Sequence, residues 1–441
     1  MSSELPNLGA VFWPVGTGDS TTIVVSDEIM MQVDLHDLAK ADDDDTHEVP
    51  IVDLLADALP RGTDGKPYLA VFVLTHADKD HCSGFKELLD RVTIGELWAT
   101  PRLWREFDDP DAPELCKDAK AFQEESIRRV EATKKAVAKG KDPDSGDRIL
   151  VVGYDTDHDE HAYSELPDRF LATPGDSITK LDGEDLRGRF EAFIHAPFKD
   201  DCAEARNDTS LSMQITLTED GGRNGKMLLF GDLAHDTIMK IFNYSEAKQR
   251  ENYLEWDLLL APHHCSKKVM YVREDGRDVL KNDVLDAFER HAREGAVIVS
   301  SSCPIPSKDV DGNNPPHRKA ADRYREIVDS GNFLCTMEWP SEDDPSSIVF
   351  AVDSAGGRIV SDDAAELSAK AAVMEAVAKR HRSLVAVAAA ASSAGRLAAE
   401  KVGGGSAGTD VQSGPERVRD AVAASRGTKN APATTVGFGS D

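Results

Sequence analysis

The sequence predicts an α/β fold in which two β-sheets form a sandwich with helices on its outer faces. Short apolar runs of strand length recur along the chain, and most of them end near a polar motif. Residues 69–74, for example, are apolar throughout, are preceded by Pro67 and lead directly into a polar turn. The strand-like runs are residues 10–13, 21–25, 29–34, 69–74, 150–152, 190–194, 212–217, 227–230, 258–260 and 297–300. We therefore expect functional side chains to gather at one edge of the sandwich.

Helix-like segments separate some of these runs. Residues 49–59 suit a helix packed on the sheet, and residues 86–89 continue a helix that starts just after His81. Residues 96–150 are predicted to be a helical insertion, because residues 113–140 are rich in Glu, Lys and Ala and end at a glycine. The insertion is either a cap that selects substrate or a solvated helical excursion, and the sequence favours neither.

The C-terminal part of the chain has a different composition. We expect one large domain over residues 1–360, an Ala-rich helical extension over 361–402 and a disordered Gly- and Ser-rich tail over 403–441. The extension either docks on its own domain, which is the favoured interpretation, or binds a protein partner or a second copy of the chain.

The overall composition indicates a globular protein with an acidic surface. Of 441 residues, 30% are charged and 40% are hydrophobic, and 51 basic against 80 acidic residues give a net charge of −29. This charge argues against a non-specific nucleic-acid coat. The six cysteines form no CxxC pair, the N-terminus has no signal-peptide pattern and no apolar run reaches 18 residues. We therefore expect no zinc knuckle, no membrane span and a cytoplasmic location.

The most informative motif follows the apolar run 69–74. His76, Asp78, Asp80 and His81 lie within six residues, on the turn that leaves this predicted strand. Imidazole nitrogens and carboxylate oxygens are the donors that divalent metals take from proteins. Without a cation, two carboxylates held so close together would repel each other. The stretch therefore predicts a metal site, with room for two adjacent ions.

This stretch resembles the HxHxDH signature of the metallo-β-lactamase superfamily, with Asp78 in place of the middle histidine. The variant HxDxDH is typical of the branch related to the competence protein ComEC. Further motifs resemble those of this branch in the expected order: residues 15–20 (VGTGDS), 32–34 (QVD), 207–211 (NDTSL), 230–232 (FGD) and 261–266 (APHHCS). Leu35 and His36 replace glycines of the second motif, and Cys265 stands where glycine is usual. The matches span residues 10–320 and imply a soluble, free-standing relative with an αββα metallo-β-lactamase sandwich.

The resemblance implies which residues bind two divalent ions. For the first ion, the implied ligands are His76 and Asp78. For the second ion, they are Asp80, His81 and His264. Asp232 is the implied bridge between the ions, and Asp208 is the implied ligand from the third motif. The third motif usually supplies a histidine, so Asn207 and His195 remain alternatives to Asp208. Asp19 and Asp34 are expected to orient ligating rings. The oxygen-rich donor set favours Mn²⁺ over Zn²⁺.

The resemblance also implies the chemistry. We expect a metal-dependent hydrolase, most naturally a phosphodiesterase acting on nucleic acid or a nucleotide-like substrate through a hydroxide that bridges the metals. The expected catalytic residues are Asp80, which also ligates, His263 as a general acid, and His317, whose position resembles a late loop facing the site. His263 is alternatively bonded to the backbone only. Two other functions remain open: a metal-binding subunit of a multiprotein stress or defence system, and a carbonyl ester or thioester hydrolase.

Overall fold

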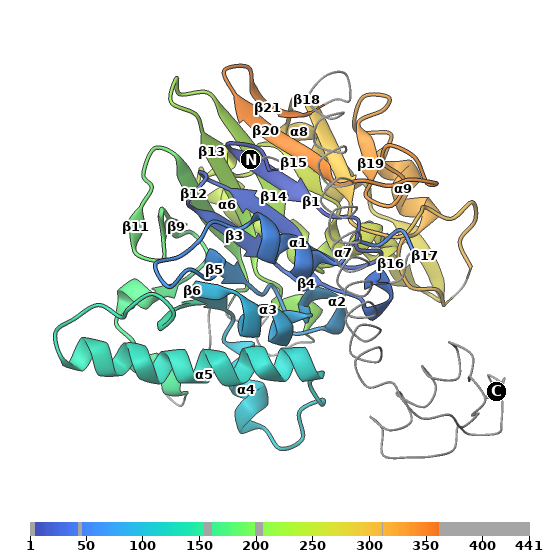
Figure 1. Ribbon diagram of the computed structural model, residues 1–441. Helices are drawn as coiled ribbons and strands as arrows, with labels where there is room; N and C mark the ends of the chain where they lie inside the picture. The colour runs from blue at the N-terminus through green and yellow to red at the C-terminus, as the bar shows by residue number, and fades with distance from the viewer. Residues whose placement is uncertain (1–4, 43–45, 154–160, 199–205, 311, 361–441) are drawn as a thin grey trace, which may run out of the picture. The chain divides into compact units, whose positions relative to one another are not determined.

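The computed structural model describes residues 5–42, 46–153, 161–198, 206–310 and 312–360 (Figure 1). All of them belong to one compact unit, Met1–Val373. The predicted helical extension at 361–402 and the predicted tail at 403–441 lie outside the described residues, and so does the partner surface predicted on the extension.

The first large sheet joins both ends of the described chain. Its strands are β1 Gly9–Phe12, β2 Thr21–Val24, β3 Met30–Val33, β5 Tyr68–Val73, β6 Thr93–Ala99, β7 Arg148–Val152, β8 Leu171–Ala172, β20 Ile348–Asp353 and β21 Gly356–Ile359. They lie in the order β21-β20-β1-β2-β3-β5-β6-β7-β8. Pairing is antiparallel from β21 to β3 and parallel from β3 to β8.

The second large sheet repeats this mixture of pairings. Its strands are β9 Ser177–Ile178, β12 Phe190–Ala196, β13 Ser212–Thr218, β14 Asn224–Leu229, β15 Trp256–Leu260, β18 Ala292–Ser300 and β19 Phe333–Cys335. They lie in the order β19-β18-β15-β14-β13-β12-β9, antiparallel from β9 to β14 and parallel from β14 to β19. The remaining short strands are β4 Leu35–His36, β10 Lys180–Leu181, β11 Glu184–Asp185, β16 Tyr271–Glu274 and β17 Arg277–Leu280.

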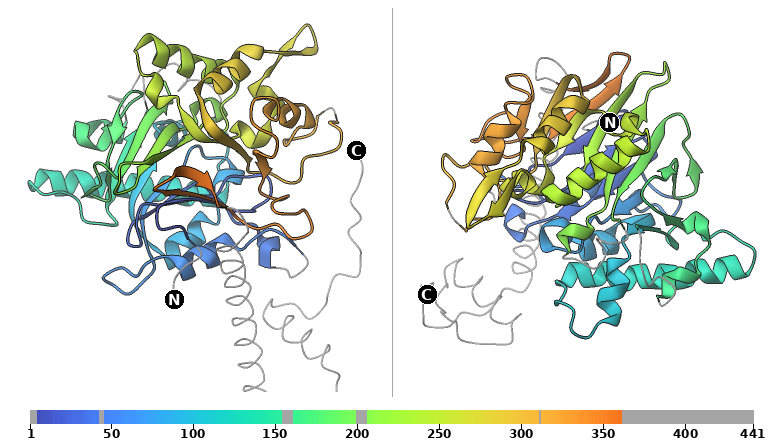
Figure 2. Two further views of the ribbon diagram at one scale, coloured as in Figure 1. Left: turned by 90° about the horizontal axis from the view of Figure 1, so that it is seen from above. Right: turned by 180° about the vertical axis from the view of Figure 1, so that it is seen from behind.

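Helices cover the outer faces of the two sheets. The α-helices are α1 Ile51–Ala58, α2 Lys79–Cys82, α3 Phe85–Arg91, α4 Arg102–Asp108, α5 Lys117–Ala138, α6 His235–Ala247, α7 Pro262–Cys265, α8 Asn282–His291 and α9 Arg318–Tyr324. Helices α1, α3 and α5 share a hydrophobic cluster with the first sheet, and α6, α8 and α9 share one with the second (Figure 2). The predicted mixed α/β fold with several sheets is confirmed. Within the described residues, no helix is long and apolar enough to cross a membrane.

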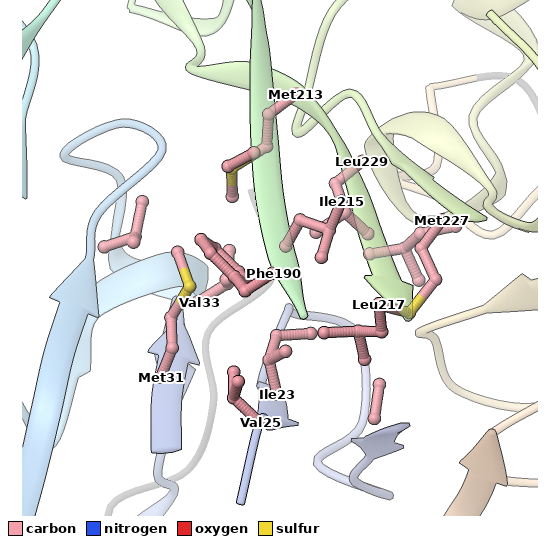
Figure 3. Packing of buried hydrophobic residues seen from close by; sticks show 14 of the residues in the cluster. Ile23, Val25, Met31, Val33, Phe190, Met213, Ile215, Leu217, Met227 and Leu229 are labelled. Carbon is pink, nitrogen blue, oxygen red and sulfur yellow. The ribbon is translucent and has the colours of Figure 1, made fainter. Parts of the chain in front are cut away.

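A third hydrophobic cluster fills the space between the sheets. In Figure 3, Ile23 and Met31 of the first sheet face Phe190 and Ile215 of the second. Side chains alternate along each strand, so a strand with neighbours on both faces is apolar throughout. This covering of both faces explains why the run at residues 69–74 shows no polar alternation.

The segment predicted as an insertion, residues 96–150, is a connection within the first sheet. Strands β6 and β7, which begin and end it, are parallel neighbours, and α4 and α5 link them. The helix predicted over 113–140 is α5, whose residues Phe122 and Val130 are fully buried against the sheet. Arg129 is also buried and donates to the carbonyl oxygens of Ile94, Gly95 and Arg148. The helix is therefore anchored to the strands that flank it.

Candidate metal centre

The predicted ligands lie where strands of the two sheets end. His76 follows β5, and Asp80 and His81 belong to the single turn of α2. Asp232 follows β14, and His264 lies in α7 just after β15. Strand β5 belongs to the first sheet and β14 and β15 to the second, so packing of the sheets brings these side chains together.

One carboxylate oxygen of Asp232 faces a first group of donors. Its Oδ1 atom is 3.2 Å from His81 Nε2 and 3.4 Å from His264 Nε2. His264 also has Nε2 3.4 Å from Asp80 Oδ2 and Nδ1 3.4 Å from Asp19 Oδ1. Among the described residues, Asp19, His81, Asp232 and His264 are a buried set whose donor atoms all lie within 4.8 Å of one another.

The other oxygen of Asp232 faces a second group. Asp232 Oδ2 is 3.7 Å from His76 Nε2 and 3.5 Å from His263 Nε2, and it accepts a hydrogen bond of 3.1 Å from Asn207 Nδ2. Asp78 Oδ2 is 3.7 Å from the same nitrogen of His76. Asp232 therefore stands between two separate sets of nitrogen and oxygen donors.

The two facing histidine rings fit a cation between them. His81 Nδ1 lies 2.7 Å from Asp34 Oδ2, and His264 Nδ1 lies 3.2 Å from the carbonyl oxygen of Ser301, so each Nδ1 donates its proton to an acceptor. When their Nε2 atoms are deprotonated, the two rings point the lone pairs of these atoms at each other across 3.2 Å. Donors at about 2.1 Å from one ion are separated by about 3.0–3.4 Å, which matches this spacing. Among the described residues, the buried Nε2 of His76 and Oδ1 of Asp232 also have no hydrogen-bond partner.

Without a cation, the rings of His81 and His264 hold extra protons. Burial lowers the pKa of His264, but the carboxylates of Asp232 and Asp19 outweigh it and raise that pKa to about 10. Burial also lowers the pKa of His81. The carboxylates of Asp232 and Asp34 outweigh this effect and raise that pKa well above its usual value. The pKa of Asp232 itself lies well below its usual range, because His264 and His81 outweigh the effect of burial. An incoming ion must therefore displace protons from the two rings.

We expect the affinity for Mn²⁺ to rise with pH because of this displacement. The pKa of His264 is about 10, so its ring is protonated throughout the neutral range, whereas Asp232 is already ionised there. From about pH 6 to about pH 9, affinity should increase about tenfold per pH unit for each proton displaced. Competition with a chelating indicator measures the affinity, and a weakly buffered titration measures the released protons. Affinity that is independent of pH, with no proton release, would contradict this reading of the rings.

Asp34 holds one of these rings in place. Its Oδ1 accepts from the backbone N–H of Thr75 at 2.8 Å, and its Oδ2 accepts from Thr75 Oγ1 at 2.7 Å as well as from His81. A carboxylate behind a ligating imidazole fixes the tautomer and raises the basicity of the other nitrogen. Gly18 allows the chain to close around this region, because a Cβ atom there would lie 2.1 Å from His36 Nδ1.

The turn that carries His263 and His264 is strained. His263, His264 and Cys265 have φ angles of 51°, 52° and 64°, in the left-handed region that non-glycine residues avoid. Two backbone hydrogen bonds hold the turn: His263 N–H to the carbonyl of Gly231 at 2.9 Å, and His317 N–H to the carbonyl of Cys265 at 3.1 Å. The turn aims two adjacent rings at opposite oxygens of Asp232, and strain of this kind is common at functional sites.

For three predicted residues, Asp208, His195 and His317, the described contacts do not include the donor groups. Asp208 lies in the 3₁₀ turn Asn207–Thr209, and among the described contacts Asn207, not Asp208, reaches Asp232. His195 is buried and donates to the carbonyl of Tyr253 at 2.9 Å, and burial lowers its pKa to about 4. The Nδ1 atom of His317 accepts from the backbone N–H of Lys267 at 3.3 Å, so its ring supports the loop that follows His264.

Two residues make contacts at the candidate metal centre that the sequence did not predict. Asp19 is a member of the buried donor set, although its motif predicted only an orienting role. Arg206, which the sequence did not single out, has its guanidinium 3.4 Å from Asp78 and 2.8 Å from Glu106. Glu106 comes from α4, which is 100 residues away in sequence, so no local pattern connects this pair.

Comparisons with known proteins assign no family to the chain. No family model matches it, and no curated protein matches it. Among solved structures, the metallo-β-lactamase MIM-1 from Novosphingobium pentaromativorans matches with 13% sequence identity and a TM-score of 0.26, over 58% of this chain and 76% of that one. At this similarity the match establishes no function. The buried cluster of histidines and aspartates is the feature of this chain that points to a function.

Proposed function

We propose that this chain is a metal-dependent hydrolase that cleaves phosphodiesters with two divalent ions. The observation that carries the proposal is the position of Asp232, whose two oxygens face two different sets of donors. A carboxylate in this position bridges two ions in dinuclear hydrolases. The ordered motifs support a relative of the ComEC branch within the metallo-β-lactamase superfamily. The two packed sheets with outer helices accord with its αββα sandwich.

The donor groups divide naturally between the two ions. His76, Asp78 and His263 would hold the first ion with Oδ2 of Asp232. The second ion would be held by Oδ1 of Asp232 together with Asp80, His81, His264 and Asp19. When bound, such ions act as Lewis acids and lower the pKa of a coordinated water. Four carboxylates among these donors favour Mn²⁺, although Zn²⁺ is compatible with the histidines.

The chain's own residues position the substrate and the ligands. Asp34 fixes the ring of His81, and the strained turn fixes His263 and His264. Arg206 is half-buried beside Asp78 and supplies a positive charge where a phosphoryl oxygen would approach the first donor group. The net charge of −29 on the whole chain disfavours a long polyanion and therefore favours a small phosphodiester.

Hydrolysis of bis-p-nitrophenyl phosphate and of single-stranded DNA by metal-stripped protein tests the proposal. We expect activity after addition of Mn²⁺ or Zn²⁺, and its loss in Asp80→Ala and His81→Ala. The matched control is His195→Gln, since His195 is equally buried but bonded to a backbone carbonyl away from the centre. Two ions per chain with no phosphodiester cleavage by any metal would contradict the proposal. In that case hydrolysis of a thioester or ester is the next activity to assay.

The environment of His263 favours a role as a metal ligand over the predicted role as a general acid. Burial lowers its pKa to about 4, so its ring is neutral at pH 7 and two nearby cations would lower that pKa further. A ring that is neutral at pH 7 carries no extra proton for a general acid to donate. A neutral imidazole 3.5 Å from Asp232 is instead suited to bind metal.

We expect His263→Ala to reduce the metal content from two ions per chain towards one. Affinity at the first site should fall by at least about 10–100-fold, the typical cost of changing a group behind a ligand, because here a direct donor is lost. Metal analysis after dialysis against a fixed Mn²⁺ concentration measures this, with His195→Gln again as the control. Two retained ions combined with a lower kcat would return His263 to the general-acid role.

A further inference from the structure

Two cysteines meet beside the turn that carries the ligands. Cys82 is the last residue of α2 and directly follows His81, whereas Cys116 caps the N-terminus of α5. Their sulfur atoms are 3.5 Å apart, although 34 residues separate them in sequence. Cys82 is fully buried and Cys116 is partly exposed, and both are free thiols in the structure. The pair thus combines one sulfur that solvent reaches with one that it does not.

The position of Cys116 favours its thiolate. Its sulfur accepts the backbone N–H of Ala119 at 3.4 Å, at the positive end of a helix of 22 residues. A hydrogen bond from the Cys82 thiol is the largest influence, and together with the backbone N–H groups it outweighs burial and lowers the pKa of Cys116 to about 6. A partly exposed thiolate with a second thiol in contact is the arrangement of a cysteine that reacts with oxidants.

We propose that Cys82 and Cys116 form an oxidation site at which a hydroperoxide converts the two thiols into a disulfide. The Cys116 thiolate attacks one peroxide oxygen, the O–O bond breaks, and the leaving hydroxide takes up a proton to become water. The resulting sulfenic acid is attacked by the sulfur of Cys82, and the displaced hydroxide leaves as water with the proton of that thiol. In total, two thiols lose two hydrogen atoms and two electrons, and hydrogen peroxide becomes two molecules of water.

The disulfide would shift the turn of α2, which carries Asp80 and His81. The sulfur atoms must approach from 3.5 Å to about 2.05 Å, so α2 or the start of α5 has to shift. The sulfur of Cys82 also lies 3.1 Å from the carbonyl oxygen of Asp78, and oxidation removes the one thiol proton that this oxygen or the sulfur of Cys116 can accept. Because α2 also carries Asp80 and His81, we expect the disulfide to weaken Mn²⁺ binding about tenfold, as changes behind ligands do. Only this effect on Mn²⁺ rests on the proposed function.

Peptide mass spectrometry of the full chain tests the site directly. Metal-stripped protein is treated with hydrogen peroxide, the remaining thiols are blocked with N-ethylmaleimide, and the protein is digested with trypsin. Lys86 and Arg105 lie between the two cysteines, so they fall on separate peptides. Cys116→Ser removes the reactive sulfur while keeping a hydroxyl that caps α5. The matched control is Cys303→Ser, at another partly exposed cysteine.

We expect a peptide pair linked through Cys82 and Cys116 in the wild type and in Cys303→Ser, and its absence in Cys116→Ser. Dithiothreitol should reverse both the link and the loss of Mn²⁺ affinity. The proposal is overturned if both thiols remain available for blocking, if Cys116 is oxidised to the sulfinic acid without a link, or if it pairs with another cysteine. The link is detected without any assay of hydrolysis, so a failure of the proposed function leaves this result unaffected.

Discussion

Asp232→Asn should abolish the binding of both ions and lower phosphodiester hydrolysis by at least about a thousandfold. The substitution keeps the shape of the side chain but removes the charge that lies 3.2 Å from His81 and 3.5 Å from His263. Loss of one peripheral donor affects one ion, whereas loss of the residue between the groups affects both. Metal content per chain after dialysis and the rate with bis-p-nitrophenyl phosphate are the two measurements.

A suitable control for this variant is Asp257→Asn. Asp257 is a half-buried carboxylate near the start of β15 that pairs with Arg293 at 2.7 Å, whereas His264 follows the other end of that strand. It should retain both ions and most of the activity. If Asp232→Asn also bound two ions, Asp232 would not bridge them, and the division of donors between its oxygens would have to be abandoned.

Arg129→Met should lower the free energy of unfolding by about 3–5 kcal/mol. The buried guanidinium of Arg129 pairs with Glu125 at 2.8 Å and donates to three carbonyl oxygens of β6 and β7 or their flanks. Methionine fills a similar volume but removes the guanidinium donors to these acceptors and the buried partner of Glu125. Urea denaturation followed by circular dichroism measures the change.

Arg128→Met provides the comparison on the same helix. Arg128 is 48% exposed and pairs with Glu125 and Asp147 at the surface, so its loss should cost less than about 1 kcal/mol. Equal effects of the two substitutions would mean that α5 is not anchored to the sheet. Such a result would support the sequence-based interpretation of residues 96–150 as a solvated helical excursion.

The sequence predicted the strands and the position of the donors because both are local features. A run such as residues 69–74 is apolar since both of its faces are buried, and the polar turn after it can be read without knowing any other segment. The neighbouring histidines and aspartates indicate metal binding by their chemistry and spacing alone. The same local signals identified the helix over 113–140 and, at residues 150–152, the strand β7 that follows it, but not the strand β6 that precedes it.

Only the tertiary structure decided which distant residues meet. The 3.2 Å contact between His81 and His264 joins segments 183 residues apart, and packing of the two sheets creates it. Sheet packing also brings Asp19 into the donor set. His195 belongs to a similarly apolar strand but bonds to Tyr253 away from the centre. The sequence of one segment determines which of its faces are apolar and become buried. The distances between segments depend on how all of them pack together.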